Sequence, residues 1–348
     1  DYKPVSGVKI EITGTSFFTV TDGKGHYFLP EVPAGSATVV AQYQSQSAST
    51  ITKINPGTTT TQDINLTSSP GSTFIYRGTI GESTVSGSDN NHLNRPEGLA
   101  IDSSGNLYIS DAFNNRIQKF DINNNYIGTL NSAEGVSIYN PSGLTVDSQD
   151  NLYVSDGPND RIIVFDKNGN VIRVLKSKNG QLFNEPLDVA VDSSGNIFIS
   201  DYRNFRISKV DSGDNLLQTI GSSNPNDPGY YFGSFAPDGL AIDKNDNIYT
   251  GDSYQNHRVQ IYDSSGKYIA TIGELGKIGS DDYHFYRPGD IAFDSNENIF
   301  ITDTGNHRVQ VYDRNRKHID TAGVAGIAGN TKDRKSTRLN SSHQSVSR

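Results

Sequence analysis

The sequence contains no cysteine, no methionine and no tryptophan among its 348 residues. Without cysteine the chain can form no disulfide and can supply no catalytic thiol, although this absence does not fix the cellular compartment. No apolar run approaches the ~18 residues that a membrane-spanning helix needs, so we expect no membrane insertion. Because methionine is missing even at position 1, we expect this sequence to be a piece of a longer protein.

Amphipathic helical patterns are also missing, since no stretch combines a 3.6-residue apolar period with helix caps. The sequence has instead 34 glycines, many Asn and Asp residues, and short runs of Val, Ile, Leu, Phe and Tyr between them. Such a pattern is typical of short strands joined by tight turns. The composition therefore predicts an all-β protein.

The last residues, "DRKSTRLNSSHQSVSR", have a different origin. The stretch from Asp333 to His343 matches, without mismatch, the translation of part of a widely used sequencing adapter, so we interpret it as translated adapter. We therefore set residues 332–348 aside as an artefactual tail and expect the protein to continue beyond this sequence. The tail contributes a formal charge of +4, so the rest of the chain carries −13 where the whole carries −9. Such an acidic body argues against binding of nucleic acid, which requires clustered Lys and Arg.

Residues 1–67 contain short alternating runs, such as Val8-Ile10-Ile12, separated by the turn signals "TDGKG" and "PEVPAG". This pattern predicts a small antiparallel β-sandwich. The segments "SGVKIEITGT", "TVTDGKGHYFLPEVPAGSATV" and "DINL" resemble the carboxypeptidase regulatory-like, transthyretin-like domain, without the opening strand of that family. The resemblance implies a spacer or adhesive module of an extracellular protein, and we interpret Asp22 and Asp63 as turn residues rather than ligands.

After a linker at residues 68–73, one pattern recurs five times. The first copy, "RPEGLAIDSSGNLYISDAFNNRIQKFD", returns as "NPSGLTVDSQDNLYVSDGPNDRIIVFD", "EPLDVAVDSSGNIFISDYRNFRISKVD", "APDGLAIDKNDNIYTGDSYQNHRVQIYD" and "RPGDIAFDSNENIFITDTGNHRVQVYD". Their prolines are 45, 45, 51 and 51 residues apart, at Pro96, Pro141, Pro186, Pro237 and Pro288. A period of this length with four strand-like runs per copy is typical of the blades of a β-propeller.

The copies resemble NHL repeats in the proline before a hydrophobic strand, in the Asp of the second strand, and in "NHR" at 256–258 and 306–308. The resemblance covers about residues 74–323, and we assign 74–331 to the propeller. Residues 76–82 match the last strand of the fourth copy at 268–274, which predicts an orphan outer strand. Because propellers commonly close by completing one blade from both ends of the chain, we expect six blades in the intact parent, with the last one truncated here.

An Asp at the end of each second strand and an Arg at the start of each third strand recur in every copy. We interpret both as structural, with the Asp accepting backbone N–H groups of the loop and the Arg spanning several oxygen acceptors between blades. An active site would not need five copies. The pairs are Asp111 and Arg116, Asp156 and Arg161, Asp201 and Arg206, Asp252 and Arg258, and Asp303 and Arg308.

The turns "DSSGN", "DSQDN", "DKNDN" and "DSNEN" have the oxygen-rich spacing of Ca²⁺ loops, but none completes the EF-hand pattern with a bidentate Glu. Hairpin turns of the Asx type explain them instead. Acids also collect where the first strands begin, and if they point into the channel mouth they could hold a divalent cation such as Ca²⁺: Glu97, Asp188, Asp238 and Asp290. We expect no other cofactor.

The loop after each second strand and the connection into each first strand should share one face of the ring. Aromatic, amide and acidic side chains there would suit stacking against sugars or holding a peptide. The candidate ligand-binding residues are Phe113, Tyr202, Arg203, Phe205, Tyr230, Tyr231, Tyr254 and His257. We interpret Phe183, Phe232 and Phe285, which stand just before the prolines, as wedges packed between blades.

The leading hypothesis is a non-enzymatic, monomeric binding module, extracellular or at the cell surface, that presents one propeller face to a protein or carbohydrate. An enzyme is the first alternative, because some NHL-like propellers resemble amidating lyases or lactonases, which place metal ligands around the channel. Only His92 and His284 are left over for such a role, too few for a three-His zinc site. No Ser-His-Asp set or phosphate loop stands out. The second alternative is the sensor portion of a larger receptor.

Overall fold

The computed structural model describes residues 9–12, 18–20, 22, 26–29, 35–43, 46–54, 80–81, 85–133, 135–176, 183–221, 226, 229, 232 and 237–323. The chain divides into two units, Asp1–Gly78 and Thr79–Arg348. Both contain antiparallel strands, and the helical segments of the described ranges are single 3₁₀ turns. The prediction of an all-β chain is therefore confirmed. No helix in these ranges is long and apolar enough to cross a membrane.

The N-terminal unit contains one four-stranded antiparallel sheet in the order β2-β1-β3-β4. Alternation along the strands places Ile10, Ile12 and Val39 on the buried side. Asp22 forms a turn, as predicted, because its carboxylate accepts the backbone N–H of His26 at 2.9 Å. Asp63 lies outside the described residues. The strands are β1 (Lys9–Ile12), β2 (Phe18–Val20), β3 (Gly35–Tyr43) and β4 (Gln46–Ile54).

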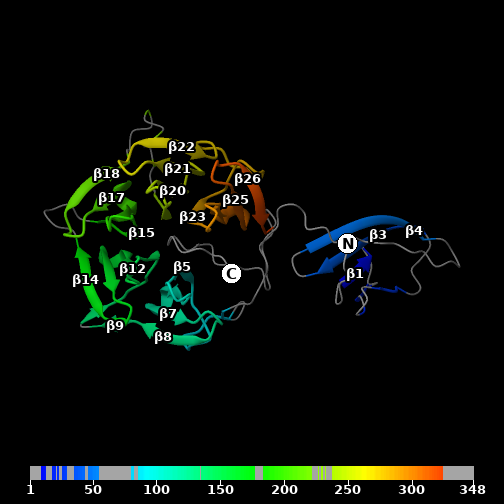
Figure 1. Ribbon diagram of the computed structural model, residues 1–348, viewed down its shortest axis with the longest axis horizontal. Coiled ribbons are helices and arrows are strands. Elements are labelled where there is room, and N and C mark those ends of the chain that lie inside the picture. Colours follow the sequence, from blue (N-terminus) through cyan, green and yellow to red (C-terminus); the bar gives the residue numbers. More distant parts are fainter. Residues whose placement is uncertain are drawn as a thin grey trace. The chain divides into compact units, whose positions relative to one another are not determined.

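Five four-stranded antiparallel sheets follow one another around a central axis in the second unit, as the five-fold repeat predicts (Figure 1). In each sheet the strands stand in chain order, with the first strand nearest the axis and the fourth at the rim. The predicted orphan strand at 76–82 lies largely outside the described residues.

The strand bounds repeat closely from blade to blade. Blade 1 is β5 (Pro96–Ile101), β6 (Leu107–Asp111), β7 (Arg116–Phe120) and β8 (Tyr126–Leu130); blade 2 is β11 (Leu144–Val146), β12 (Leu152–Asp156), β13 (Arg161–Phe165) and β14 (Val171–Lys176). Blade 3 is β15 (Pro186–Val191), β16 (Ile197–Asp201), β17 (Arg206–Val210) and β18 (Leu216–Ile220); blade 4 is β19 (Leu240–Ile242), β20 (Ile248–Asp252), β21 (Arg258–Tyr262) and β22 (Tyr268–Ile272). Blade 5 is β23 (Pro288–Phe293), β24 (Ile299–Asp303), β25 (Arg308–Tyr312) and β26 (His318–Ala322), and a short hairpin of β9 (Ser132–Ala133) and β10 (Val136–Ser137) joins blades 1 and 2. Single 3₁₀ turns follow four of the second strands: η1 (Ala112–Asn114), η2 (Gly157–Asn159), η3 (Tyr202–Asn204) and η4 (Thr304–Asn306).

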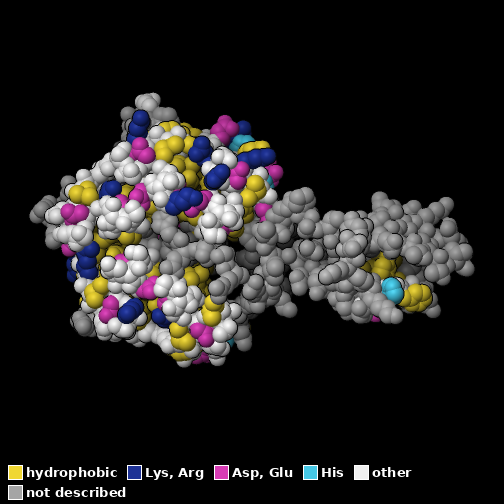
Figure 2. Space-filling view, viewed as in Figure 1, with side chains coloured by type: hydrophobic (Ala, Val, Ile, Leu, Met, Phe, Trp, Pro, Cys, Tyr) yellow, Lys and Arg dark blue, Asp and Glu magenta, His cyan; other side chains and the backbone are white. Residues whose placement is uncertain are grey.

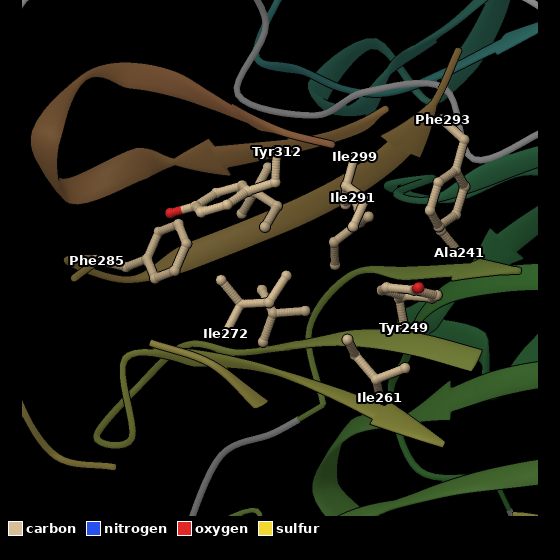
Figure 3. Close-up of a cluster of buried hydrophobic side chains, with 11 residues drawn as sticks. Ala241, Tyr249, Ile261, Ile272, Phe285, Ile291, Phe293, Ile299 and Tyr312 are labelled. Carbon is tan, nitrogen blue, oxygen red and sulfur yellow. The ribbon is translucent and has the colours of Figure 1, made fainter. Parts of the chain in front are cut away.

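Hydrophobic layers between neighbouring blades form the core. Between blades 4 and 5, Tyr249 meets Phe293 edge-on, with ring centroids 4.9 Å apart, and Ile291 fills the space beside them (Figure 3). Phe285 is fully buried in the same layer, while Phe183 and Phe232 are buried in the layers between blades 2 and 3 and blades 3 and 4. The interpretation of these three phenylalanines as wedges is confirmed.

The outermost strand of every blade contains a β-bulge at its second residue. In blade 1, Phe120 pairs with Tyr126 and Lys119 pairs with Gly128, so Ile127 has no partner across the ladder. The bulge turns an aliphatic side chain outward, and the five bulge residues are all exposed by 41–55%: Ile127, Ile172, Leu217, Ile269 and Ile319. The exposed aliphatic side chains of the strands thus mark the rim.

Candidate binding face

One end of the propeller carries the variable loops. The antiparallel pairing of Pro96 with Asp111 shows that the first strand of blade 1 begins where its second strand ends. The loops between second and third strands and the connections into the first strands therefore share this end, which we call the 2–3 face. The short turns between first and second strands, and between third and fourth strands, occupy the opposite end.

In blades 1, 2, 3 and 5, the Asp of a buried Asp–Arg pair holds the connection into the first strand by accepting a backbone N–H group. In blade 5, Asp303 accepts the backbone N–H of Tyr286 at 2.7 Å and the Nε of Arg308 at 2.7 Å. The remaining guanidinium nitrogens of Arg308 donate to the carbonyls of Ser280 at 2.8 Å and Asp281 at 2.6 Å. Both partners are thus fully used within the fold, and the structural interpretation of the repeated pair is confirmed. The same Asp–Arg hydrogen bond closes the other four blades, between Asp111 and Arg116, Asp156 and Arg161, Asp201 and Arg206, and Asp252 and Arg258.

In blades 1, 2 and 4, the residue just before the repeat arginine joins one blade to the next. Asn115 accepts the backbone N–H of Asn140 at 2.8 Å, and Asp160 accepts that of Glu185 at 2.8 Å. In blade 4 the same role falls to His257, whose Nδ1 accepts the N–H of Arg287 at 3.3 Å. His257 is only 6% exposed, and burial lowers the pKa of this imidazole. The histidine of the "NHR" signature at 256–258 therefore connects two neighbouring blades by accepting a backbone hydrogen bond, and we call such a contact a joint between blades.

Each blade presents at least one aromatic side chain at the 2–3 face, and we call five of them the aromatic set: Phe113, Tyr139, Tyr202, Tyr254 and Tyr286. Four of these side chains are exposed by 39–56%, and that of Tyr202 is partly buried. Sequence reasoning named only three of them. It missed Tyr139 and Tyr286, which stand two residues before a proline where blades 1 and 3 have asparagine. Aligning the copies on their prolines, and comparing that column, would have found both.

Arginines accompany these aromatic residues. The guanidinium of Arg95 lies 4.9 Å from the ring centroid of Phe113, and that of Arg287 lies 5.9 Å from the centroid of Tyr254. Such distances are those of cation–π contacts. Burial, together with nearby carboxylates, raises the pKa of the Tyr202 hydroxyl, so this group is a neutral hydrogen-bond donor at physiological pH.

The structure distributes the predicted ligand-binding residues unevenly. Tyr202, Arg203 and Tyr254 lie close enough to interact electrostatically across blades 3 and 4, and Arg203 forms an ion pair with Glu185. Phe113 belongs to blade 1, and Phe205 is a partly buried residue with a left-handed backbone, φ 55°. Two further candidates, Tyr230 and Tyr231, lie outside the described residues.

The four acids proposed for a cation are engaged separately. Asp188 is 2% exposed and accepts the N–H groups of Val189 at 2.9 Å and Leu240 at 2.7 Å, which ties blade 3 to blade 4. Asp290 accepts the N–H of Ile291 at 2.9 Å. Asp238 accepts the Ser253 hydroxyl at 3.0 Å, and Glu97 pairs with Arg95 at 3.0 Å. Within the part of the chain that the structure describes, no three His, Cys, Asp or Glu side chains gather as metal ligands. The expected grouping of these acids is therefore not formed.

The Asp-led turns at the opposite end are Asx turns, as interpreted. In the first of them, Asp102 accepts the backbone N–H groups of Ser104 at 3.1 Å and Asn106 at 2.8 Å, and its other oxygen accepts the Asn106 amide at 2.8 Å. The same three contacts recur from Asp147 and Asp294. These carboxylate oxygens serve as backbone acceptors, which accounts for the spacing without a bound ion.

The two histidines left over by the sequence analysis lie in matching connections, at 81–96 and 273–288. His92 Nδ1 lies 2.7 Å from Asp89, and His284 Nδ1 lies 2.8 Å from Asp281. Backbone N–H groups and His284 hold the pKa of Asp281 at about 2. Each His–Asp pair closes a local turn. The backbone carbonyls of the His and the Asp accept hydrogen bonds from the repeat arginine of the same blade, Arg116 in blade 1 and Arg308 in blade 5.

Basic and acidic side chains are interspersed over the propeller face shown in Figure 2 and form no field of one sign.

Comparison with protein families gives two matches. Residues 1–67 match the carboxypeptidase regulatory-like domain, and residues 93–120, 139–165, 183–210, 236–262 and 285–312 match the NHL repeat. Comparison with the sequences of curated proteins gives no match.

Several solved structures share the fold at low sequence identity. A streptogramin B lyase is 12% identical with a TM-score of 0.50, covering 95% of this chain and 91% of that chain. A nidogen/laminin complex gives 19% identity and a TM-score of 0.52, covering 67% of this chain and 82% of that chain. A gluconolactonase from Xanthomonas campestris gives 15% identity and a TM-score of 0.51, covering 67% and 76%. At these identities the likeness concerns the fold alone.

Proposed function

Because the chain belongs to the NHL-repeat proteins and begins with a carboxypeptidase regulatory-like domain, we propose that it is an extracellular or cell-surface binding module whose 2–3 face holds a protein or carbohydrate. The aromatic set supports this proposal. Four exposed aromatic rings, on blades 1, 2, 4 and 5, stand on loops that buried Asp–Arg pairs hold in place. A rigid frame lowers the entropy cost of ordering these side chains on binding.

The fold is compatible with several functions, since a propeller hosts unrelated activities. The nidogen/laminin complex shows that a propeller of this shape occurs in a complex between proteins. The lyase and the gluconolactonase show that it also occurs in enzymes. What favours binding here is that the repeated polar residues are used up within the fold while the aromatic residues are exposed.

An array of glycans and proteins tests the proposed face. We expect the Tyr254→Ala, Tyr286→Ala double variant to lose binding of any ligand that the wild-type chain retains. The control is Phe28→Ala, which removes an aromatic side chain of the N-terminal unit that is even more exposed than the two tyrosines. Unchanged binding by the double variant would show that the aromatic set is not the site.

The enzyme alternative, a lyase or lactonase with a channel metal, is tested by mass spectrometry of bound metal on the purified chain. Stoichiometric zinc or calcium that resists dialysis would favour the enzyme over the binding module. The sensor alternative predicts a membrane-anchored parent, which protease treatment of intact cells would reveal by release of this region.

A sixth blade would complete the ring in the intact protein. Leu99 and Leu107 of blade 1 are partly exposed, whereas the matching residues of the other four blades are at most 2% exposed because the preceding blade covers them. At the other end of the series, His307 is exposed where its counterpart His257 accepts an N–H from the next blade. A chain extended by one more NHL unit should therefore melt several degrees higher; an unchanged melting temperature would contradict the closure.

A further inference from the structure

Among the residues that the structure describes, Arg287 differs from the other exposed arginines of the 2–3 face in forming no ion pair with a carboxylate. Arg95 pairs with Glu97 at 3.0 Å, and Arg203 pairs with Glu185. In the described ranges, Arg287 contacts the ring of Tyr254 and donates its backbone N–H to His257, and its side chain forms no ion pair. Arg287 is an exposed residue, so the N–H groups of its guanidinium can bind an acceptor on a partner.

The surroundings of Arg287 hold it in a defined position. Its backbone is left-handed, with φ 57°, and is fixed from both sides by the His257 acceptor and by the proline that follows. The neighbouring residue Tyr286 is exposed, and its backbone N–H is held by Asp303 at 2.7 Å. The guanidinium and the two tyrosines, Tyr254 and Tyr286, are therefore presented by a rigid support.

The chemistry around Arg287 favours a protein over a sugar. The guanidinium lies at the ring of Tyr254, as that of Arg95 lies at the ring of Phe113, so each occupies a surface on which a sugar would stack. Tyrosine and arginine are also the residues enriched at the energetic centres of protein interfaces, whereas lysine is depleted there.

We propose that Arg287, flanked by Tyr254 and Tyr286, is the recognition centre for an acidic peptide segment of a partner protein. An Asp or Glu of that segment accepts two N–H groups of the guanidinium, while apolar atoms beside it cover the tyrosine rings. This inference rests on the proposed function of the 2–3 face and specifies its partner.

A peptide array tests the inference with the full chain as probe. Every peptide that contains Asp or Glu is printed beside its Asn or Gln counterpart, and neutral and uronate-containing oligosaccharides are printed on the same slide. We expect the wild-type chain to prefer acidic peptides over their amide counterparts by at least about tenfold, the effect of one charge-assisted hydrogen bond. Arg287→Gln should abolish this preference, and Arg287→Lys should restore only part of it because lysine lacks the planar fork.

The matched control is Arg314→Gln, which removes an exposed arginine from a turn at the opposite end and should leave the preference unchanged. Equal binding of acidic and amide peptides, or an acidic preference that survives Arg287→Gln, would overturn the inference. Retention of oligosaccharides alone, lost in the Tyr254→Ala, Tyr286→Ala variant, would overturn the acidic-peptide assignment but leave the proposed face intact. Binding of peptides and sugars that is insensitive to all of these changes would overturn both.

Discussion

Replacing Asp303 by Asn should destabilise the propeller strongly, although the two side chains have nearly the same shape. Asp303 is fully buried, and the side chain of its partner Arg308 is only 5% exposed. The amide oxygen of Asn can still accept the N–H of Tyr286, but the positive charge of Arg308 then lacks its counter-ion. Because removing one partner of a buried ion pair leaves an uncompensated charge, we expect a loss of about 3–5 kcal/mol in the free energy of unfolding.

The exposed pair of Arg203 and Glu185 provides the comparison within the same chain. Their side chains are 56% and 34% exposed, and solvent screens such pairs, so Glu185→Gln should cost no more than about 1 kcal/mol. A further variant, Asp303→Asn combined with Arg308→Met, removes both charges and should cost less than the sum of the two single changes. The non-additivity would identify the ion pair as the source of the loss.

Urea unfolding of each variant measures these free energies, followed by circular dichroism and by tyrosine fluorescence, since the chain contains 18 tyrosines and no tryptophan. The reasoning fails if Asp303→Asn costs no more than Glu185→Gln. It also fails if the effects of Asp303→Asn and Arg308→Met are additive, because the two groups would then not act as a pair.

Two further predictions concern the joints between blades. Burial holds the pKa of His257 below its ordinary value of 6.5, so this joint contributes its full stability above pH 6.5 and loses it as the pH falls toward the lowered pKa. The His257→Asn variant replaces the imidazole with the amide acceptor that blade 1 has at this position. We expect the melting temperatures at pH 7.5 and pH 5.5, roughly the range over which an ordinary histidine titrates, to differ less in this variant than in the wild-type chain. If the difference is unchanged, His257 is not the source of the pH dependence of stability. Gly239→Ala would place a methyl group 2.6 Å from the Cα of Asp290, so we expect a loss of at least about 1–3 kcal/mol. Gly128→Ala is the control, because nothing lies within 4 Å of the added atom, and equal losses for both glycines in urea unfolding would contradict the packing argument.

The repeat alone predicted most of the fold, and the residues show why. The spacing of the prolines and the Asp-led turns fixes strand lengths and turn types locally, within one blade. The five-fold recurrence of Asp and Arg also separated structural residues from candidate ligands, and the hydrogen bonds of Asp303 and Arg308 agree with that separation. The candidate site was predicted less completely. Tyr139 and Tyr286 differ from the asparagines that blades 1 and 3 have at the same position, which marks them as candidates only once the copies are aligned. Their exposure depends on how the neighbouring blade packs.

A related reason applies to Glu97, Asp188, Asp238 and Asp290, which do not gather as metal ligands within the described residues. These acids share a position at the start of the first strands, but their partners differ: Glu97 pairs with the nearby Arg95, whereas Asp188 also reaches the next blade. Asp188, for example, binds the N–H of Leu240, 52 residues further along the chain. Whether a carboxylate faces a channel or a backbone donor is decided by packing between blades, so spacing along the chain could not resolve it.

The sequence by itself determined the class of fold, the number of repeated units and the device that holds each unit together, because these depend on interactions within about one period of the repeat. The tertiary structure decided which aromatic residues are exposed and which arginines are paired. Arg95, Arg203 and Arg287 all belong to the 2–3 face, yet only the structure shows that Arg287 is the one without a carboxylate among the described residues. The reason is physical: ion pairing depends on distances between side chains brought together by folding, and those distances are not a function of sequence separation.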